Sequence, residues 1–405
     1  MPEIDAIPWG ALIQRAVGLR HDLHRQPELG WQERATAERI RARLDELSIT
    51  WRQCADTGTV ARLAANAPGR HIALRADIDA LAIHEATGTD WASESTGLMH
   101  ACGHDGHTAT LMAAAEWLKH CEADLPGPVT LLFQPAEEGG HGAKRMIEDG
   151  ALDGVDAVFG WHNWPAIPFG QAVCPDGVVM AGNGTFRIDV TGQGGHASQP
   201  EACRDPVLAA SAIVVALQQV VSRCLPAQDA TVLSVTSFDA KSGPTTIPDT
   251  ATLEGSFRLA DTSRQPALVE HVQRIAQATA QSYGAHAAVT VFPRYQATVN
   301  HPPEAARFRQ ALAAEFGPGV VSLDTALPIM ASEDFSYYLR ERPGAFALIG
   351  ANDGPGRDTP CHSPRYDFND ALISPVARIY ARLAGAQLPG ERENASNATM
   401  QATGS

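Results

Sequence analysis

In the sequence of 405 residues we expect no segment that approaches the ~20 apolar residues that a helix needs to span a bilayer. It is also poor in basic residues, with 31 Lys and Arg against 46 Asp and Glu, which gives a formal net charge of −15. Nucleic acids and anionic lipid surfaces repel such a protein, so we expect neither nucleic acid nor membrane as a partner. A small anionic substrate remains possible, because local cationic groups can still hold a carboxylate.

Two further features are missing. The seven cysteines are an odd number and are scattered without the spacing of a disulfide framework. The N-terminal residues MPEIDAIPWG have neither the basic region nor the apolar stretch of a secretory signal. We therefore expect a cytoplasmic protein whose thiols stay reduced.

The chain is too long for one ordinary core, since single cores stop growing at roughly 250–300 residues. Apolar runs that have the character of buried strands alternate with helical stretches, which is typical of an α/β domain with a largely parallel sheet. We expect strands at residues 71–78, 129–134, 155–160 and 345–349, and helices at residues 35–47, 108–120 and 143–148.

Between residues 182 and 299 the pattern changes to strand, helix, strand, strand, helix, strand. That order is typical of a compact ferredoxin-like α+β unit. We therefore predict an α/β catalytic domain, formed by residues 1–182 and 298–388, that is interrupted by a smaller inserted domain at residues 183–297. The tail at residues 389–405 lacks periodicity and is predicted to be disordered.

Four short segments carry side chains that can bind metal, and each follows an expected strand or precedes an expected helix. They are MHACGHDGH at 99–107, PAEEG at 135–139, GWHN at 160–163 and PCHSP at 360–364. Ligands bind at the carboxyl ends of strands in open α/β sheets, so we expect these segments to meet there. Thiolate, imidazole and carboxylate donors together suit Zn²⁺, Mn²⁺, Co²⁺ or Ni²⁺.

The residue types in these segments point to hydrolysis. Cys102 and His104 are two residues apart in a glycine-bearing turn, so both side chains can face one cavity. Asp105 stands where a helix cap is expected, and we assign it to capping or to orienting a ligand. Of the adjacent Glu137 and Glu138, one can bind the metal while the other takes a proton from a water whose pKa the metal lowers to around 7.

The motifs HACGHDGH, QPAEEGG, GWHNWP, GQGGHASQP, ASEDFSYY and PCHSPRYDF together resemble the signatures of the aminoacylase-like branch of the co-catalytic metallopeptidases. That branch includes hippurate hydrolase and the indole-acetyl-amino-acid hydrolases. The resemblance, which runs from about residue 16 to 385, implies hydrolysis of N-acyl amino acids by a homodimer or a dimer-based oligomer. It also implies two divalent metal ions per subunit, held by Cys102, His104, Glu138, His162 and His362.

The resemblance implies further roles. Glu137 would be the general base, and Asp77 would support the metal ligands without binding the metal. In the inserted domain, which supplies dimerisation and part of the pocket in the family, His196 would stabilise the oxyanion in the other subunit's site. Arg258 would grip the substrate's carboxylate. The family commonly has Asn where this chain has Thr245, and a hydroxyl cannot reproduce an amide's paired donor and acceptor, so carboxylate recognition is expected to differ.

Four alternatives stay open, one of which is a non-enzymatic role in which the metal-binding residues are idle. The same chemistry could act on short peptides, as in a dipeptidase or carboxypeptidase. A hydrolase with a Ser or Cys nucleophile is a second, although the chain has no Gly-x-Ser-x-Gly elbow. A nucleotide-dependent enzyme is a third, supported only by a weak Gly-x-Gly-x-x-Ala match at 192–197 that lacks the expected acidic partner.

Overall fold

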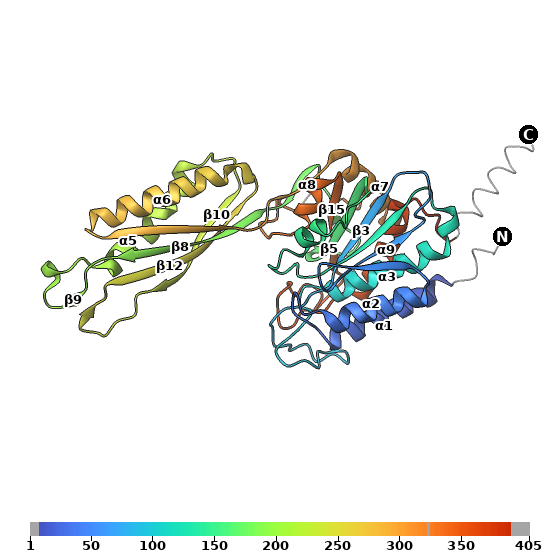
Figure 1. The fold of residues 1–405 in the computed structure, drawn as a ribbon, viewed down its shortest axis with the longest axis horizontal. Coiled ribbons are helices and arrows are strands. Elements are labelled where there is room, and N and C mark those ends of the chain that lie inside the picture. Colours follow the sequence, from blue (N-terminus) through green and yellow to red (C-terminus); the bar gives the residue numbers. More distant parts are fainter. Residues whose placement is uncertain (1–7, 322–324, 390–405) are drawn as a thin grey trace, which may run out of the picture. The chain divides into compact units, whose positions relative to one another are not determined.

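The computed structural model describes residues 8–321 and 325–389, and the chain divides into two compact units (Figure 1). Unit 1 comprises Met1–Gly177, Val299–Ala326 and Tyr337–Ser405, and unit 2 comprises Val178–Thr298 and Leu327–Ser336. Unit 2 therefore interrupts unit 1 in the sequence. The predicted disordered tail lies outside the described residues, apart from Pro389.

A seven-stranded sheet in the order β1-β2-β4-β3-β5-β15-β6 forms the centre of unit 1. Its four middle strands are parallel, and the three outer strands pair antiparallel. This confirms the predicted α/β class. Strands β3, β4 and β15 are buried along almost their whole length, which is why they stand out as continuous apolar runs. The strands are β1 (Thr50–Cys54), β2 (Gly58–Leu63), β3 (Ile72–Asp77), β4 (Val129–Gln134), β5 (Ala157–Pro168), β6 (Ala172–Val173) and β15 (Gly344–Asn352).

Helices pack around this sheet, and α3 contacts both α1 and α9 (Figure 1). Helix α3 begins four residues earlier than expected, which brings the metal-binding motif into its first turn. Helix α1 was not predicted; it buries Leu12, Ala16 and Leu23. The helices are α1 (Trp9–Arg25), α2 (Arg34–Glu46), α3 (His104–His120), α4 (Gly142–Glu148), α7 (Pro302–Phe316), α8 (Ser336–Glu341) and α9 (Ile373–Leu383).

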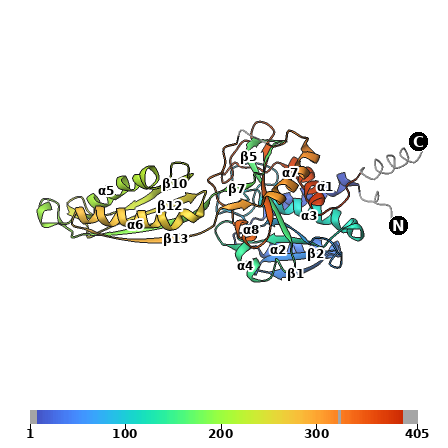
Figure 2. The ribbon, with the colours of Figure 1, turned by 90° about the horizontal axis from the view of Figure 1, so that it is seen from above.

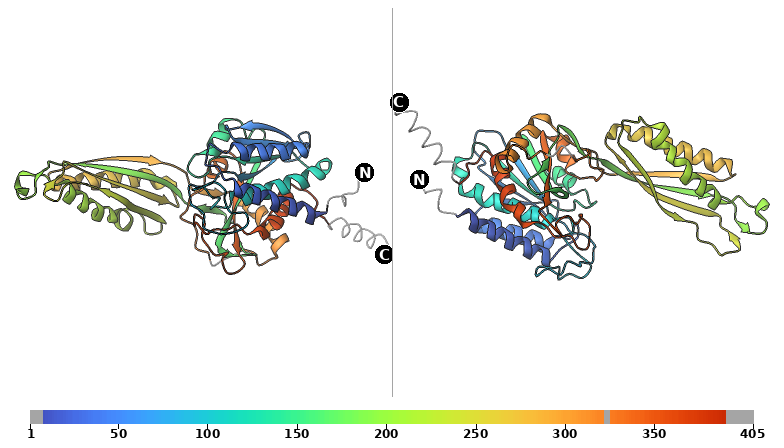
Figure 3. Two further views of the ribbon diagram at one scale, coloured as in Figure 1. Left: turned by 90° about the horizontal axis from the view of Figure 1, so that it is seen from below. Right: turned by 180° about the vertical axis from the view of Figure 1, so that it is seen from behind.

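Unit 2 contains a four-stranded antiparallel sheet in the order β10-β12-β8-β13. Two helices lie along one face of this sheet (Figures 2 and 3) and share its apolar core. In β8, buried side chains alternate with more exposed ones, as expected for a sheet with only one covered face. The predicted order of elements is confirmed, with β8 (Gly182–Thr191), α5 (Pro206–Gln219), β10 (Thr231–Asp239), β12 (Thr250–Leu259), α6 (Gln265–Ser282) and β13 (His286–Pro293).

The helical segment Pro206–Cys224 is long and apolar enough, by length and composition alone, to cross a membrane. The expectation that no segment approaches this size was therefore wrong. A single such helix is weak evidence, because core helices of ordinary domains have the same composition. Ile213 and Leu217 pack in the core of unit 2, whereas Leu208 and Val215 are 54% and 74% exposed.

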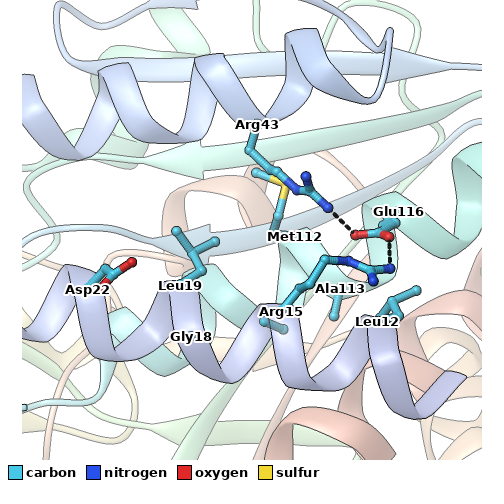
Figure 4. A pocket seen from close by; sticks show the side chains of 10 residues that line it. Leu12, Arg15, Gly18, Leu19, Asp22, Arg43, Met112, Ala113 and Glu116 are labelled. Carbon is cyan, nitrogen blue, oxygen red and sulfur yellow. Dashed lines mark hydrogen bonds and ion pairs between the residues drawn. The ribbon is translucent and has the colours of Figure 1, made fainter.

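A pocket of about 290 Å³ lies among α1, α2 and α3 (Figure 4). Arg15 of α1 and Arg43 of α2 both pair with Glu116 of α3, the second at 2.7 Å. None of the predicted site residues lines this pocket. Glu116 therefore links three helices, and the chemistry of the chain lies elsewhere.

Candidate metal centre

All four predicted metal-binding segments meet in unit 1, and one thiol is central to them. The ligand atoms of Cys102, His104 and His162 lie within 4.8 Å of one another, and so do those of Cys102, Glu138 and His362. Cys102 Sγ is 3.3 Å from His162 Nε2, and His362 Nε2 is 3.1 Å from Glu138 Oε1. The five predicted ligands thus form two groups that share the sulfur of Cys102.

Backbone conformation explains how residues close in sequence reach this cluster. Gly103 has φ 91°, and a Cβ on it would lie 2.4 Å from Asn163 Oδ1, so both the conformation and the space require glycine. His362 has φ 67°, a left-handed conformation that is uncommon for a residue with a side chain. His162 lies within β5, because this strand continues past the expected end at residue 160 and pairs with β15 as far as Pro168.

Asp79 holds two of the predicted ligands at once. His104 Nδ1 donates to the backbone oxygen of Asp79 at 3.0 Å and lies 3.1 Å from its Oδ1. The backbone N–H of Glu138 donates to Asp79 Oδ2 at 2.9 Å. Because a carbonyl oxygen only accepts, Nδ1 carries a proton, and Nε2 is the atom that can bind a metal. Asp79 was not among the predicted site residues, although an acidic residue two positions after the buried strand β3 was a signal for it.

The surroundings of His104 favour a cation. Its buried Nε2 makes no hydrogen bond with any residue in the described part of the chain. Burial opposes a charge on the ring, but Asp77, Asp79 and Glu138 outweigh burial and raise the pKa of His104 to about 10. A metal ion could take the place of that proton, so the residues fit a divalent cation.

Asp77 lies on the metal-binding side of His104, with Oδ2 3.5 Å from Nε2. It accepts a hydrogen bond from Arg75 Nη1 at 2.5 Å, and its Oδ1 is 2.6 Å from His107 Nδ1. Burial raises the pKa of Asp77, but Arg75, His104 and His107 outweigh burial and hold it well below its usual value. His107 Nε2 is 2.7 Å from Asn163 Oδ1, so a continuous network supports the cluster. His107 and Asn163 were not among the predicted site residues.

Asp105 does not cap α3. The N-cap is Gly103, and no side chain caps the helix. The helix begins at His104, so Asp105 lies inside the first turn, where its Oδ2 is 2.8 Å from His24 Nδ1 and 2.9 Å from Arg20 Nε. Of the two roles predicted for Asp105, capping was therefore wrong, and orienting a ligand stays a prediction. Burial raises the pKa of Asp105, but Arg20 and His24 outweigh burial and lower it below its usual range.

Glu137 lies at the same cluster. Its side-chain oxygen is within 4.8 Å of the ligand atoms of His104 and Glu138, and the residue is 6% exposed. Glu137 belongs to neither of the groups that contain Cys102. Its position therefore suits a group that exchanges a proton beside the metal.

The three other predicted residues lie in unit 2. His196 lies in β9 (Gly195–His196) and pairs with Thr246 of β11 (Thr246–Ile247). The backbone N–H of Ala197, the residue that follows His196, donates to Thr245 O at 2.9 Å. Arg258 lies toward the end of β12, eight residues after Thr250 and hence about 26 Å along the strand at roughly 3.3 Å per residue. The structure thus places His196 beside Thr245 on an exposed ribbon. Arg258 donates to Ser332 Oγ at 2.9 Å.

Comparisons with known proteins gave matches that span most of the chain. The model of a family described as "Peptidase family M20/M25/M40" matches residues 73–386. "IAA-amino acid hydrolase ILR1-like 2" of Arabidopsis thaliana is 38% identical, covering 91% of this chain and 84% of its own. The hippurate hydrolase of Campylobacter jejuni is 37% identical, covering 90% and 94%. A solved Bacillus subtilis protein, YXEP, described as a dinuclear metal binding peptidase from the M20 family, is 34% identical with a TM-score of 0.80, covering 93% and 98%.

Proposed function

The chain belongs to peptidase family M20/M25/M40, and from this premise we propose that its metal centre hydrolyses the amide bond of N-acyl amino acids, such as hippurate or related conjugates. The products are a carboxylic acid and a free amino acid. The observation that carries the proposal is the pair of ligand groups that share Cys102. The names of the hippurate hydrolase and the IAA-amino acid hydrolase support amides of this class.

Two divalent cations would be held by His104 and His162 on one side and by Glu138 and His362 on the other, with Cys102 common to both. The donor set suits Zn²⁺, Mn²⁺, Co²⁺ or Ni²⁺. The buried Nε2 of His104 and the dinuclear relative support this assignment. When bound, such ions polarise the acyl carbonyl and bring the pKa of a water close to neutrality.

Glu137 acts as the general base. It takes a proton from the attacking water as the new C–O bond forms at the acyl carbon. It then returns that proton to the leaving nitrogen as the C–N bond breaks, so the proton balance closes. Its burial and its place beside His104 and Glu138 support this role.

Unit 2 completes the site from a second copy of the chain. We assign His196 to oxyanion stabilisation in the partner subunit's site, and Arg258 to the substrate carboxylate. Within one chain His196 lies on an exposed ribbon, while Arg258 is far along β12 from that ribbon. The exposed Leu208 and Val215 of α5 support a homodimer or a dimer-based oligomer, because pairing would cover them.

A substrate panel tests the proposal. The metal-replete protein is given hippurate, N-acetyl amino acids, indole-acetyl conjugates and dipeptides, and release of the free amino acid is measured. We expect turnover of the acyl amino acids and loss of turnover after a chelator. Preference for dipeptides would favour a dipeptidase, and full activity in the chelator would exclude metal-dependent hydrolysis.

A further inference from the structure

A second thiol lies beside the cysteine that both ligand groups share. Cys361 Sγ lies 4.0 Å from the backbone oxygen of Cys102, to which its thiol donates. Cys361 belongs to none of the groups of metal-binding atoms found among the described residues, so the metal centre alone does not explain its place.

The backbone segments that contain the two cysteines lie side by side. The N–H of His362 donates to Ala101 O at 2.7 Å, so the residues before and after these two lie next to each other. Both thiols are free in the structure.

Neighbouring residues of β5 hold the two sulfur atoms in this place. His162 Nε2 is 3.3 Å from Cys102 Sγ, and Asn163 Nδ2 donates to Cys361 Sγ at 3.7 Å. The left-handed conformation of His362 ends the alternation of an extended chain. As a result Cys361 faces Cys102 while the next residue, His362, reaches Glu138.

We propose that Cys102 and Cys361 form a reversible disulfide that disables the metal centre under oxidation. Hydrogen peroxide first oxidises Cys361, which is half-buried, to a sulfenic acid, with one water leaving. The sulfur of Cys102 then attacks that of Cys361; the S–S bond forms, the S–O bond breaks and a second water leaves. Two thiols thus lose two electrons and two protons to one peroxide.

The consequence for the metal rests on the proposed function. Cys102 is the one ligand common to both groups, and a disulfide sulfur has no thiolate charge to offer a metal. Oxidation therefore weakens both metal positions together. A dithiol reductant restores the thiolate, and added metal restores the centre.

Peptide mapping tests the bridge itself. Metal-stripped and metal-loaded protein are treated with hydrogen peroxide, blocked with an alkylating agent and digested without reductant. We expect a cross-linked peptide pair that contains Cys102 and Cys361, a loss of two of the seven titratable thiols, and full reversal by dithiothreitol. Cys102 or Cys361 found only as sulfinic or sulfonic acid, or paired with another cysteine, would overturn the proposal.

Two variants separate the bridge from general oxidative damage. Cys361→Ser is expected to keep its metal during a peroxide exposure that releases the metal from the unsubstituted protein. Cys224→Ser, which removes a half-buried thiol in unit 2, is expected to behave like the unsubstituted protein. Equal metal release from all three would refute the link. The bridge in metal-stripped protein does not depend on catalysis, so an inactive protein would contradict only the proposed function.

Discussion

Replacing Asp79 by Asn would test how the metal centre is held together. The Asp79 carboxylate faces two donors: His104 Nδ1 lies 3.1 Å from one oxygen, and the backbone N–H of Glu138 donates to the other at 2.9 Å. An amide keeps one acceptor oxygen and puts an NH₂ donor in place of the second. One of the two donors would then face another donor, so at least one ligand loses its support.

The expected magnitude follows from that lost bond. A hydrogen bond to a charged group contributes about 1.5–3 kcal/mol, and about 1.4 kcal/mol corresponds to a tenfold change in an equilibrium constant. Metal affinity should therefore fall roughly 10- to 100-fold, which is the range seen when groups that orient metal ligands are removed. The backbone oxygen of Asp79 still holds His104 at 3.0 Å, so the effect stays below that of removing a ligand.

Competition with a chromogenic chelator measures the affinity, and thermal unfolding of the metal-stripped protein shows whether the fold is intact. Asp156→Asn is a matched control, because Asp156 Oδ2 accepts a backbone N–H, that of His71, at 2.8 Å in the same unit. Its metal affinity should not change. An Asp79→Asn affinity within about twofold of the unsubstituted protein, or an equal loss in the control, would refute the reasoning.

Three further predictions concern the same region. Glu137→Gln should retain its metal yet lose about 10²–10⁴-fold in kcat, because the amide cannot take a proton. Steady-state rates measured together with metal-to-protein ratios check this. Preserved turnover would show that Glu137 is not the base. Cys102→Ala should lower metal content and activity together, and an unchanged metal content would exclude it as a ligand. Burial lowers the pKa of His24, but the charge of Asp105 and hydrogen bonds to Asp105 and Glu85 outweigh burial and raise this pKa to about 9. Protonated His24 therefore stabilises the folded state by about 3 kcal/mol. This stabilisation is complete below pH ~6.5 and is lost as the pH rises through about 9. Denaturant unfolding of metal-stripped protein between these pH values should show that decline in the unsubstituted protein and lack it in His24→Gln; the same decline in both would contradict the assignment.

Much of the fold could be predicted because burial leaves a direct mark on a sequence. Strands covered on both faces, such as β4 and β15, are continuous apolar runs, and alternation in β8 marks a sheet with one covered face. The start of α3 was misplaced by four residues, since the glycine turn that precedes it contains no capping side chain. That error is the reason why a capping role was considered for Asp105.

The metal-binding residue types were visible in the same way. Cys102, the adjacent Glu137 and Glu138, and the histidines of the other motifs are unusual groups to find at the ends of buried strands. Their chemistry alone pointed to metal-assisted hydrolysis, and the resemblance of the motifs named the family. No knowledge of distances was needed for either step.

Tertiary structure alone decided which groups touch. Asp79 is ordinary in sequence. Its bond to Glu138 exists only because β3 and β4 lie side by side in one sheet, and its bond to His104 only because α3 packs against β3. Cys102 and Cys361 are 259 residues apart, and only the packing of the C-terminal loop against the segment before α3 brings the sulfur of Cys361 to 4.0 Å from the backbone oxygen of Cys102. Sequence pattern records burial and local conformation, because each residue carries its own polarity and shape. Contacts between distant residues depend on how whole elements pack, and that information is spread over the entire chain.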